Sequence, residues 1–353
     1  MEPHSAHGDL GRRPTVGVVG LGYWGPNLLR VLIDRPDVEV RWLCDTDLSR
    51  LERFARRYPC VRCISAHIDD VLADPDLDGV LLATPVFTHY ELARASIEAG
   101  KHTFVEKPLA PSSAAAAELI ELAGARDLVL MCGHTFLYSP PVRKIRRLLA
   151  IGELGEPYFI SSSRVNLGLH QRDVSVIWDL GPHDFSILLY WLGCLPATIR
   201  AIGRDSILAG IADVAFVTME FDSGLIANVE LSWLAPSKLR RTVIVGSKKM
   251  VLYEDGGAEA VKIYDRGVDY RDPETFGEYQ LSYRSGDILT PQLASDEPLN
   301  LQVADFVRGL RGDRSVSARL KLALDVVRLA EAADESLRNG GEQVRVGERA
   351  GVA

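Results

Sequence analysis

Short apolar runs alternate with amphipathic stretches of helical period from Thr15 to about Gly133. The expected strands are Thr15–Gly20, Val38–Cys44, Gly79–Ala83, His102–Glu106 and Leu128–Gly133. The expected helices lie near Pro26–Ile33, Leu48–Tyr58, Tyr90–Ala99 and Ser112–Ala125. Strands that alternate with helices of this length predict βαβ units, and therefore an α/β domain built on a doubly wound parallel sheet.

After Gly133 the pattern changes to strand-like runs joined by turn signals. The expected strands are Tyr158–Val165, Thr198–Gly203, Val214–Phe221, Leu225–Leu234, Arg241–Gly246, Met250–Tyr253, Val261–Tyr264 and Val344–Val346. The expected helices are Pro141–Ala150, Val174–Trp191, Leu299–Gly309 and Ser317–Arg338. Turns such as Asp222-Ser223-Gly224 suit antiparallel hairpins, whereas Asp265–Pro298 shows no clear pattern. The second half therefore predicts an α+β domain with a mainly antiparallel sheet.

Charge and cysteine content narrow the classes of partner. The formal net charge is −8 at pH 7, and an acidic chain lacks the basic field that nucleic acids and anionic membranes attract. No apolar run approaches the roughly 20 residues that span a bilayer. Five cysteines in 353 residues do not make a disulfide framework, so we expect a reduced, cytoplasmic protein.

Cys60 and Cys63 form a CxxC motif with two interpretations. The motif is either a redox pair or half a zinc site, or two small residues around a short strand. The chain has no second CxxC, and only His67 lies nearby at ligand spacing. This favours the structural interpretation, and we expect no metal site.

Gly20, Gly22 and Gly25 form a GxGxxG that follows an apolar run and opens a helix. Glycine permits the tight turn, lets the backbone approach a pyrophosphate, and lets helix pack on strand. The phosphates would lie at the helix N-terminus, where free N–H groups favour anions. The alternative is a glycine-rich turn of another α/β fold.

Asp45 follows Gly25 by 20 residues, at the end of the second expected strand. An acid at this position accepts hydrogen bonds from the ribose hydroxyls of NAD and repels the extra phosphate of NADP. Arg50 and later arginines keep NADP as the alternative cofactor. The spacing favours a dinucleotide-binding domain that takes NAD.

Two further segments indicate catalysis. Lys107 follows a strand that ends in Glu106, at the sheet edge where ligands lie in α/β proteins. Asp179 and His183 are four residues apart and share a face if the segment is helical, although Pro182 counts against a regular helix there. A carboxylate beside an imidazole suits proton transfer near neutral pH. The alternatives are a surface lysine before a turn and a surface Asp–His pair.

These residues resemble the glucose–fructose oxidoreductase and inositol dehydrogenase family (Gfo/Idh/MocA), over nearly the whole chain. The resemblance is carried by Gly20-Leu21-Gly22-Tyr23-Trp24-Gly25, Ala83-Thr84-Pro85 with His89, Gly100-Lys101-His102 through Glu106-Lys107-Pro108, Gly152-Glu153-Leu154-Gly155, and the Asp179–His183 spacing.

The resemblance implies a role for each matching residue. Lys107 would hydrogen-bond the reacting oxygen, His183 would be the general acid/base, and Asp179 would orient it or bind an adjacent hydroxyl. The peptide before Pro108 would be cis. The implied cofactor-binding set is Gly20, Gly22, Tyr23, Trp24, Gly25, Asp45, Thr84, Pro85, His89, Glu106 and Lys107. The second domain would carry an open sheet whose outer face builds a homodimer or homotetramer.

Candidate substrate contacts come from the start of the second domain and the catalytic helix: Tyr138, Arg164, Asn166, His170, Asp179 and His183. Arg164 and Asn166 alternate along a strand and share a face, and salt bridging inside the domain is the alternative for Arg164. The stretches Gly133–Pro141 and Arg164–Leu169 resemble the branch of sugar-nucleotide dehydrogenases linked to surface polysaccharide and antibiotic sugars.

The expected organisation is a disordered extension at residues 1–13, an NAD-binding domain at 14–134, and a substrate-binding and oligomerisation domain at 135–353. The expected function is NAD-dependent oxidation of a secondary hydroxyl of a sugar, with a nucleotide-activated sugar favoured. Alternatives are an NADPH-dependent keto-sugar reductase, an inositol or cyclitol dehydrogenase, and a cofactor-bound regulator without catalysis.

Overall fold

The computed structural model of the chain describes residues 12–270 and 281–346. The chain forms two compact units, each considered by itself. The first comprises Met1–Tyr138 and Asp296–Val327, and the second comprises Ser139–Ser295 and Arg328–Ala353. Apart from Arg12 and Arg13, the expected extension at residues 1–13 lies outside the described residues.

The first unit is built on a parallel sheet with strand order β3-β2-β1-β4-β5-β6. The strands are β1 (Thr15–Val19), β2 (Glu39–Cys44), β3 (Cys63–Ser65), β4 (Gly79–Leu82), β5 (His102–Val105) and β6 (Leu130–Cys132). The residues of β1, β4 and β6 are all buried. Strands covered on both faces read as continuous apolar runs, as the sequence pattern predicted.

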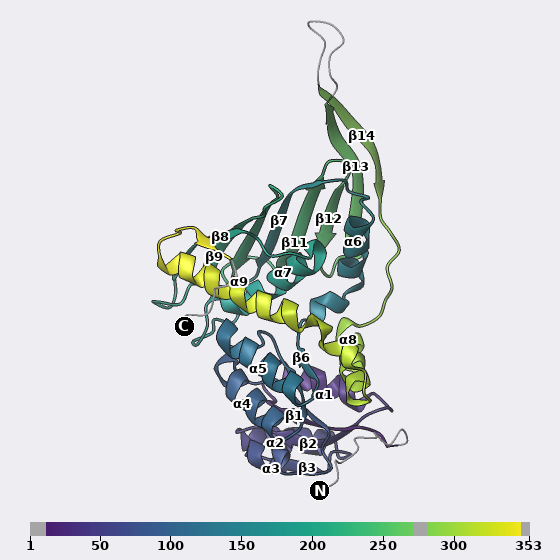
Figure 1. Cartoon of the computed structure of the whole chain (residues 1–353), viewed down its shortest axis with the longest axis vertical. Coiled ribbons are helices and arrows are strands. Elements are labelled where there is room, and N and C mark those ends of the chain that lie inside the picture. The colour runs from purple at the N-terminus through teal and green to yellow at the C-terminus, as the bar shows by residue number, and fades with distance from the viewer. Residues whose placement is uncertain (1–11, 271–280, 347–353) are drawn as a thin grey trace, which may run out of the picture. The chain divides into compact units, whose positions relative to one another are not determined.

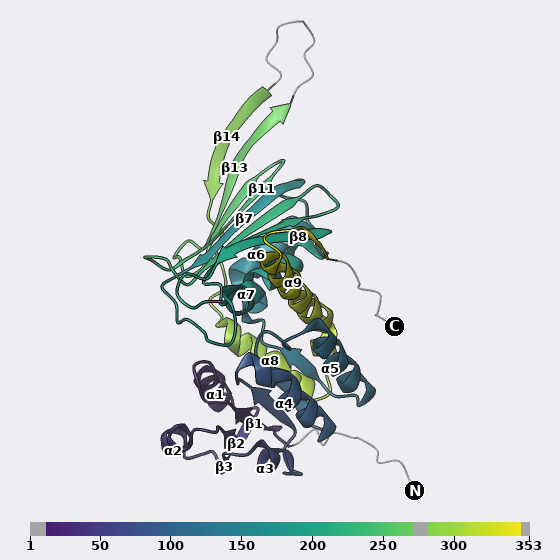
Figure 2. The same ribbon diagram turned by 90° about the vertical axis from the view of Figure 1, so that its left-hand side faces the viewer.

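Helices cover both faces of this sheet (Figures 1 and 2). They are α1 (Gly25–Ile33), α2 (Leu48–Arg57), α3 (Ile68–Leu72), α4 (Val86–Glu98), α5 (Ser113–Ala125), the 3-10 helix η1 (Thr135–Tyr138), α8 (Pro298–Leu310) and the 3-10 helix η2 (Arg314–Arg319). Helix α4 packs on α5, and α1 packs on α8. The doubly wound parallel sheet expected from the sequence is confirmed.

Helix α8 joins the first unit although it lies far along the chain. The Phe306 ring of α8 meets Phe104 of β5 edge to face, with centroids 5.8 Å apart. On the same helix, Gln302 accepts a hydrogen bond from Thr135 at 2.7 Å. A division of the chain after residue 134 therefore omits residues 296–327 from the first unit. Their apolar face is buried against α1, β5 and η1, which no local pattern reveals.

The second unit contains a nine-stranded mixed sheet with order β14-β13-β12-β11-β7-β10-β9-β8-β15 in the described residues. The strands are β7 (Pro157–Val165), β8 (Thr198–Arg204), β9 (Val214–Glu220), β10 (Ile226–Ser232), β11 (Leu239–Gly246), β12 (Met250–Glu254), β13 (Val261–Tyr270), β14 (Leu281–Leu289) and β15 (Val344–Arg345). Only β7 and β10 pair in parallel among these strands. The mainly antiparallel sheet expected from the sequence is confirmed.

One face of this sheet is covered and the other is open. Helices α6 (Pro140–Ala150) and α7 (Val176–Leu192) lie on one face, and residues 328–338 of α9 (Leu320–Arg338) pack beside β8 (Figure 2). Burial alternates along β9 and β10, as expected for a sheet with one solvated face. The exposed face carries Ile202, Phe216 and Ile226, whose residues are about half exposed.

Strand β14 falls in the segment Asp265–Pro298, to which the sequence assigned no structure. It pairs with β13 from Ile263↔Leu289 to Tyr270↔Leu281. Nearly all of its residues are exposed, so the strand has no buried face. Apolar and polar residues therefore do not alternate along it, and the pattern on which the prediction depended is missing.

Candidate active site

The turn between β1 and α1 has the shape that a dinucleotide requires. Gly20 has a φ of +92°, and a Cβ there would lie 2.5 Å from the Ala83 carbonyl oxygen. A Cβ on Gly25 would lie 1.8 Å from the Gly20 oxygen. A Cβ on Gly22 would instead clash with nothing, since its nearest neighbour, the Arg50 guanidinium, lies at 3.9 Å. Two glycines are needed for the turn itself, and the third leaves the backbone accessible to a pyrophosphate.

Asp45 stands beside this turn at the end of β2. Its carboxylate accepts hydrogen bonds from the Leu21 N–H at 2.6 Å and the Asp47 N–H at 2.8 Å. These bonds hold both oxygens next to the glycine turn, where a ribose would follow the pyrophosphate. The half-exposed Arg50 lies 3.8 Å from Asp45.

Tyr23 points into solvent and Trp24 precedes α1 as its N-cap residue.

The Glu-Lys-Pro turn follows β5 at the same edge of the sheet, and the Lys107–Pro108 bond is cis, as the resemblance implied. Glu106 is buried beneath the turn and accepts a hydrogen bond from the Lys107 N–H at 3.2 Å. A Cβ on Gly133 would lie 2.7 Å from the Glu106 carboxylate, so glycine is required beside it. Burial raises the pKa of Glu106 to about 7.

The side chain of His89 lies between the two loops that flank this edge. Its Nδ1 is 2.7 Å from the Pro108 carbonyl oxygen, and its Nε2 is 2.9 Å from the Thr84 carbonyl oxygen. The residue is buried. Both ring nitrogens therefore face backbone carbonyl oxygens, and the cofactor contacts predicted for His89, Thr84 and Pro85 stay predictions.

Asp179 and His183 lie on one face of α7, which continues through Pro182. Pro182 therefore does not interrupt the helix, although the sequence analysis counted it against a regular helix. The Trp233 indole N–H donates to the Asp179 carboxylate at 3.0 Å. Sequence reasoning missed Trp233, whose only signal was an aromatic residue at the end of a strand.

The segment that precedes α7 passes over the same tryptophan. The His170 ring lies 5.3 Å from the Trp233 ring at an angle of 58°. A Cβ on Gly168 would lie 2.9 Å from Trp233 and 3.3 Å from the Asn166 amide nitrogen. The second unit thus brings together Asn166, His170 and Asp179, three residues that the sequence predicted as substrate contacts, around Trp233.

Two predicted substrate contacts, Arg164 and Tyr138, are buried and bonded inside their own units. Arg164 is buried and bonds the carboxylate of Asp184, which also accepts from Ser162 at 2.8 Å. This is the internal salt bridge that the sequence left open as the alternative. Tyr138 is also buried, and its hydroxyl donates to Asp305 at 2.8 Å. Both side chains are used inside their own unit.

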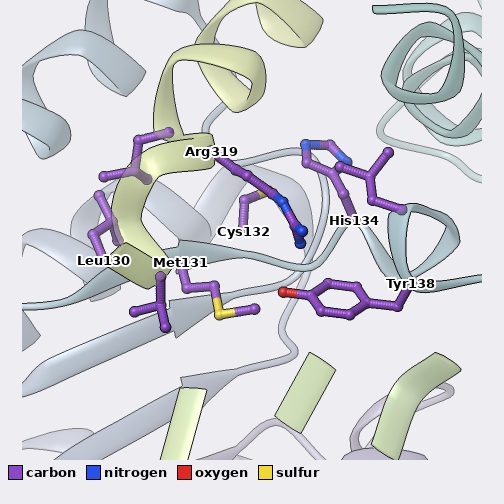
Figure 3. A pocket seen from close by; sticks show the side chains of 9 residues that line it. Leu130, Met131, Cys132, His134, Tyr138 and Arg319 are labelled. Carbon is purple, nitrogen blue, oxygen red and sulfur yellow. The ribbon is translucent and has the colours of Figure 1, made fainter. Parts of the chain in front are cut away.

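Tyr138 lines a small cavity inside the first unit. Its walls are Leu130, Met131, Cys132, His134, Leu137, Tyr138, Val316, Arg319 and Leu320. Figure 3 shows the Arg319 side chain extending toward Tyr138, and its guanidinium carbon lies 4.7 Å from the Tyr138 ring centroid. The cavity volume of about 20 Å³ holds about one water molecule and excludes a sugar. Burial, with a smaller effect from Lys107, lowers the pKa of His134 to about 3, so this histidine is neutral.

The cysteines of the CxxC motif and the lengths of the helices bear on metal binding and on membrane insertion. Cys60 and Cys63 are free, and Cys63 begins β3. Within residues 12–270 and 281–346, no group of three or more His, Cys, Asp or Glu side chains is arranged to hold a metal ion. Over the same ranges, no helix combines the length and apolar character needed to cross a bilayer.

The raised pKa of Glu106 predicts how the stability of the protein changes with pH. Because its folded pKa is raised to about 7, its contribution to stability is present below its unfolded pKa of about 4.3 and is lost as pH rises through the folded value. Between about pH 5 and pH 8, the wild type should lose about 3 kcal/mol of unfolding free energy relative to Glu106→Gln. Urea unfolding at both pH values measures this difference.

The matched control is Glu52→Gln on the exposed surface of α2. This variant should follow the wild type at both pH values. An identical pH dependence of the wild type and Glu106→Gln would contradict the assignment of a buried, proton-binding carboxyl.

Comparison with known proteins identifies the family. The sequence profile described as the oxidoreductase family with an NAD-binding Rossmann fold matches residues 15–134. The profile of the GFO/IDH/MocA C-terminal domain matches residues 142–252. Each profile falls on one of the two structural units, and together they include the glycine turn, the Glu-Lys-Pro turn and α7.

Individual relatives agree with these matches. The UDP-N-acetylglucosamine 3-dehydrogenase of Acidithiobacillus ferrooxidans is 31% identical over 64% of this chain and 69% of its own length. The scyllo-inositol 2-dehydrogenase (NAD(+)) of Bacillus subtilis is 29% identical over 64% of this chain and 68% of its own. Across the curated relatives compared, the match spans 60% to 71% of their length.

Solved structures match over nearly the full chain. The crystal structure of GenD2 from gentamicin A biosynthesis in complex with NAD is 25% identical, with a TM-score of 0.75, and the match covers 98% of this chain and 99% of that one. The glycine turn, Asp45 and the two profile matches therefore lead to one conclusion. The chain belongs to the Gfo/Idh/MocA family of NAD-binding oxidoreductases.

Proposed function

We propose that this protein oxidises a secondary hydroxyl of a sugar, with NAD as the oxidant. The observation that carries the proposal is the pairing of Asp179 and His183 on one face of α7, in a chain whose NAD-binding unit presents Lys107 at the carboxyl edge of its sheet. Parallel α/β sheets bind their ligands at that edge. His183 on α7 would supply a base, and Lys107 at the sheet edge would supply a cation for the reacting oxygen.

Oxidation of a secondary alcohol removes a hydride from carbon and a proton from oxygen. When bound, NAD⁺ accepts the hydride. In the proposed mechanism His183 accepts the proton, because imidazole exchanges protons near neutral pH. The ammonium group of Lys107 binds the same oxygen and stabilises negative charge as the proton leaves. Asp179, held by the Trp233 N–H at 3.0 Å, orients His183 or binds a neighbouring hydroxyl.

A nucleotide-activated sugar is the substrate class we infer. The UDP-N-acetylglucosamine 3-dehydrogenase relative supports it, and so does the NAD-bound neighbour from gentamicin A biosynthesis. The pathway would then be cytoplasmic synthesis of antibiotic or surface-polysaccharide sugars. The scyllo-inositol dehydrogenase relative supports a free cyclitol as the second candidate.

The test is a screen of UDP-, dTDP- and GDP-sugars and inositols for NADH formation. We expect turnover of a nucleotide sugar by the wild type. His183→Asn and Lys107→Met should each lower kcat by about 10²- to 10⁴-fold, because each removes a group that acts on the reacting oxygen. Binding of NAD, measured by calorimetry, should be retained in His183→Asn.

Lys321→Met is the matched control, since this lysine of the first unit is largely exposed and pairs with Asp325. It should keep the wild-type kcat. Turnover of an inositol, but of no nucleotide sugar, would make a free cyclitol the substrate class in place of a nucleotide sugar. Wild-type turnover in Lys107→Met would refute the catalytic assignment, and the absence of turnover in every arm would favour a cofactor-bound regulator.

Cofactor choice provides a second test. The Asp45 carboxyl group lies beside the glycine turn, where an acid disfavours the extra phosphate of NADP, so NAD should bind more tightly than NADP. Asp45→Ala should weaken the binding of NAD by about 10- to 100-fold, which corresponds to the loss of one charge-assisted hydrogen bond. The same variant should also bind NAD and NADP with more similar affinities. Asp47→Ala, which removes the neighbouring N-cap of α2, should preserve the preference. Tighter binding of NADP than NAD by the wild type would favour the keto-sugar reductase.

We further infer that a second copy of this chain covers the open face of the second sheet. That face carries Ile202 and Phe216 side by side on paired strands, together with Phe159 and Ile226 on another pair. Exposed apolar groups of this extent mark an interaction surface, and a two-fold axis places the same patch on both partners. Sedimentation should show a dimer or tetramer that Phe216→Lys dissociates. A monomeric wild type would contradict this.

A further inference from the structure

His89 connects the loop that follows β4 with the loop that follows β5. Its Nδ1 lies 2.7 Å from the carbonyl oxygen of Pro108, and its Nε2 lies 2.9 Å from that of Thr84. Only about 1% of the residue is exposed. Both carbonyl oxygens therefore lie within hydrogen-bond distance of one buried imidazole, which keeps water away from them.

The local fold explains why His89 reaches both loops. Helix α4 begins at Val86, directly after Pro85, and side chains on a helix lean toward its N-terminus. His89, one turn into the helix, consequently points back to Thr84. Strands β4 and β5 are parallel neighbours with Leu82 opposite Val105, so the loops that follow them leave the sheet side by side.

The chemistry of the two contacts is specific. A carbonyl oxygen can only accept, so each ring nitrogen must carry a proton to donate. A neutral ring donates one of the two bonds, and a ring with both protons donates both. Burial lowers the pKa of His89, the two carbonyls favour the charged form, and the nearby charge of Lys107 disfavours it. Lys107 is the charged group that faces the ring from the adjoining turn.

We propose that His89 is a positioning residue that holds the turn carrying Lys107 against the loop after β4, and so fixes the position from which Lys107 binds the reacting oxygen. The proposal rests on the catalytic role proposed above for Lys107. Pro108 is the next residue after Lys107, so a bond to the Pro108 carbonyl constrains the lysine backbone directly. A displacement of about 1 Å of a catalytic group can cost about 10²-fold in rate.

A second histidine in the same unit provides the matched control. His102 begins β5, at the opposite end of that strand from Lys107, and its Nδ1 accepts the Val129 N–H at 2.9 Å. Burial lowers its pKa as well, to about 4. It is thus a largely buried histidine with a backbone hydrogen bond, but it touches neither loop of the candidate site.

The experiment compares His89→Phe, His89→Gln and His102→Phe in the full chain. Hydrogen exchange without ligands reports each loop independently of any substrate. His89→Phe should raise exchange in residues 84–88 and in residues 105–110, with other peptides unchanged. His89→Gln, whose amide can still donate, should show a smaller increase. His102→Phe should raise exchange near Val129 and leave both loops as they are.

Kinetics on the sugar that the wild type turns over form the second arm. His89→Phe should lower kcat by about 10²-fold, while KM and the Kd of NAD change less than about threefold, and His89→Gln should recover part of kcat. His102→Phe should keep the wild-type kcat per folded molecule. A purely structural role would instead lower the folded fraction and leave kcat per NAD-binding site unchanged.

Three outcomes would overturn the proposal: exchange that rises in only one loop, exchange that rises equally in all peptides, or a kcat of His89→Phe within twofold of the wild type. If His89→Phe does not fold, His89→Gln decides on the same two readouts. If the wild type oxidises no sugar, the proposed function fails, whereas the exchange arm still determines whether His89 joins the loops.

Discussion

Parallel strands place their carboxyl ends along one edge of a sheet, and every cofactor-side feature of this protein depends on that constraint. The glycine turn follows β1, Asp45 follows β2, Thr84 follows β4 and Glu106 follows β5. Their order in the sheet differs from their order in the chain, yet all four emerge at the same edge. The buried apolar strands supply the stability, and the loops at their ends are free to carry the chemistry.

Polar groups buried at this edge are held by backbone. Asp45 accepts two backbone N–H groups, Glu106 accepts the N–H of Lys107, and His89 contacts two carbonyls. Such bonds fix side chains without the rotamer freedom of side-chain pairs, because both partners belong to short loops anchored by strands. In the second unit, Asp179 is held instead by the indole of Trp233. Asp45, Glu106 and Asp179 are thus oriented before any ligand binds.

Where the signal was local, sequence reasoning identified the elements that carry the predicted site residues. The glycine spacing, the acid at the end of β2, the Glu-Lys-Pro turn and the Asp179–His183 spacing are each contained in a few consecutive residues or one strand–helix unit. It failed where a partner lies far along the chain. No local sequence feature indicates that Arg164 pairs with Asp184 or that Tyr138 bonds Asp305. Arg164 and Tyr138 were therefore predicted to contact substrate, although each is bonded internally.

The same limit explains the other omissions. Trp233 is 54 residues from the Asp179 that it bonds, and α8 returns to the first unit from far along the chain because Phe306 packs on Phe104. Strand β14 has no buried face, so hydrophobic patterning cannot reveal it. Long-range pairing, in contrast to periodicity, is not encoded in any single window of sequence.

The most direct test of the account is a crystal structure of the protein with NAD and the sugar that it oxidises. We expect the reacting hydroxyl to contact both the Lys107 ammonium and the His183 imidazole, with the adenosine ribose against Asp45. A bound sugar whose reacting hydroxyl lies beyond hydrogen-bond reach of Lys107 and His183 would contradict it.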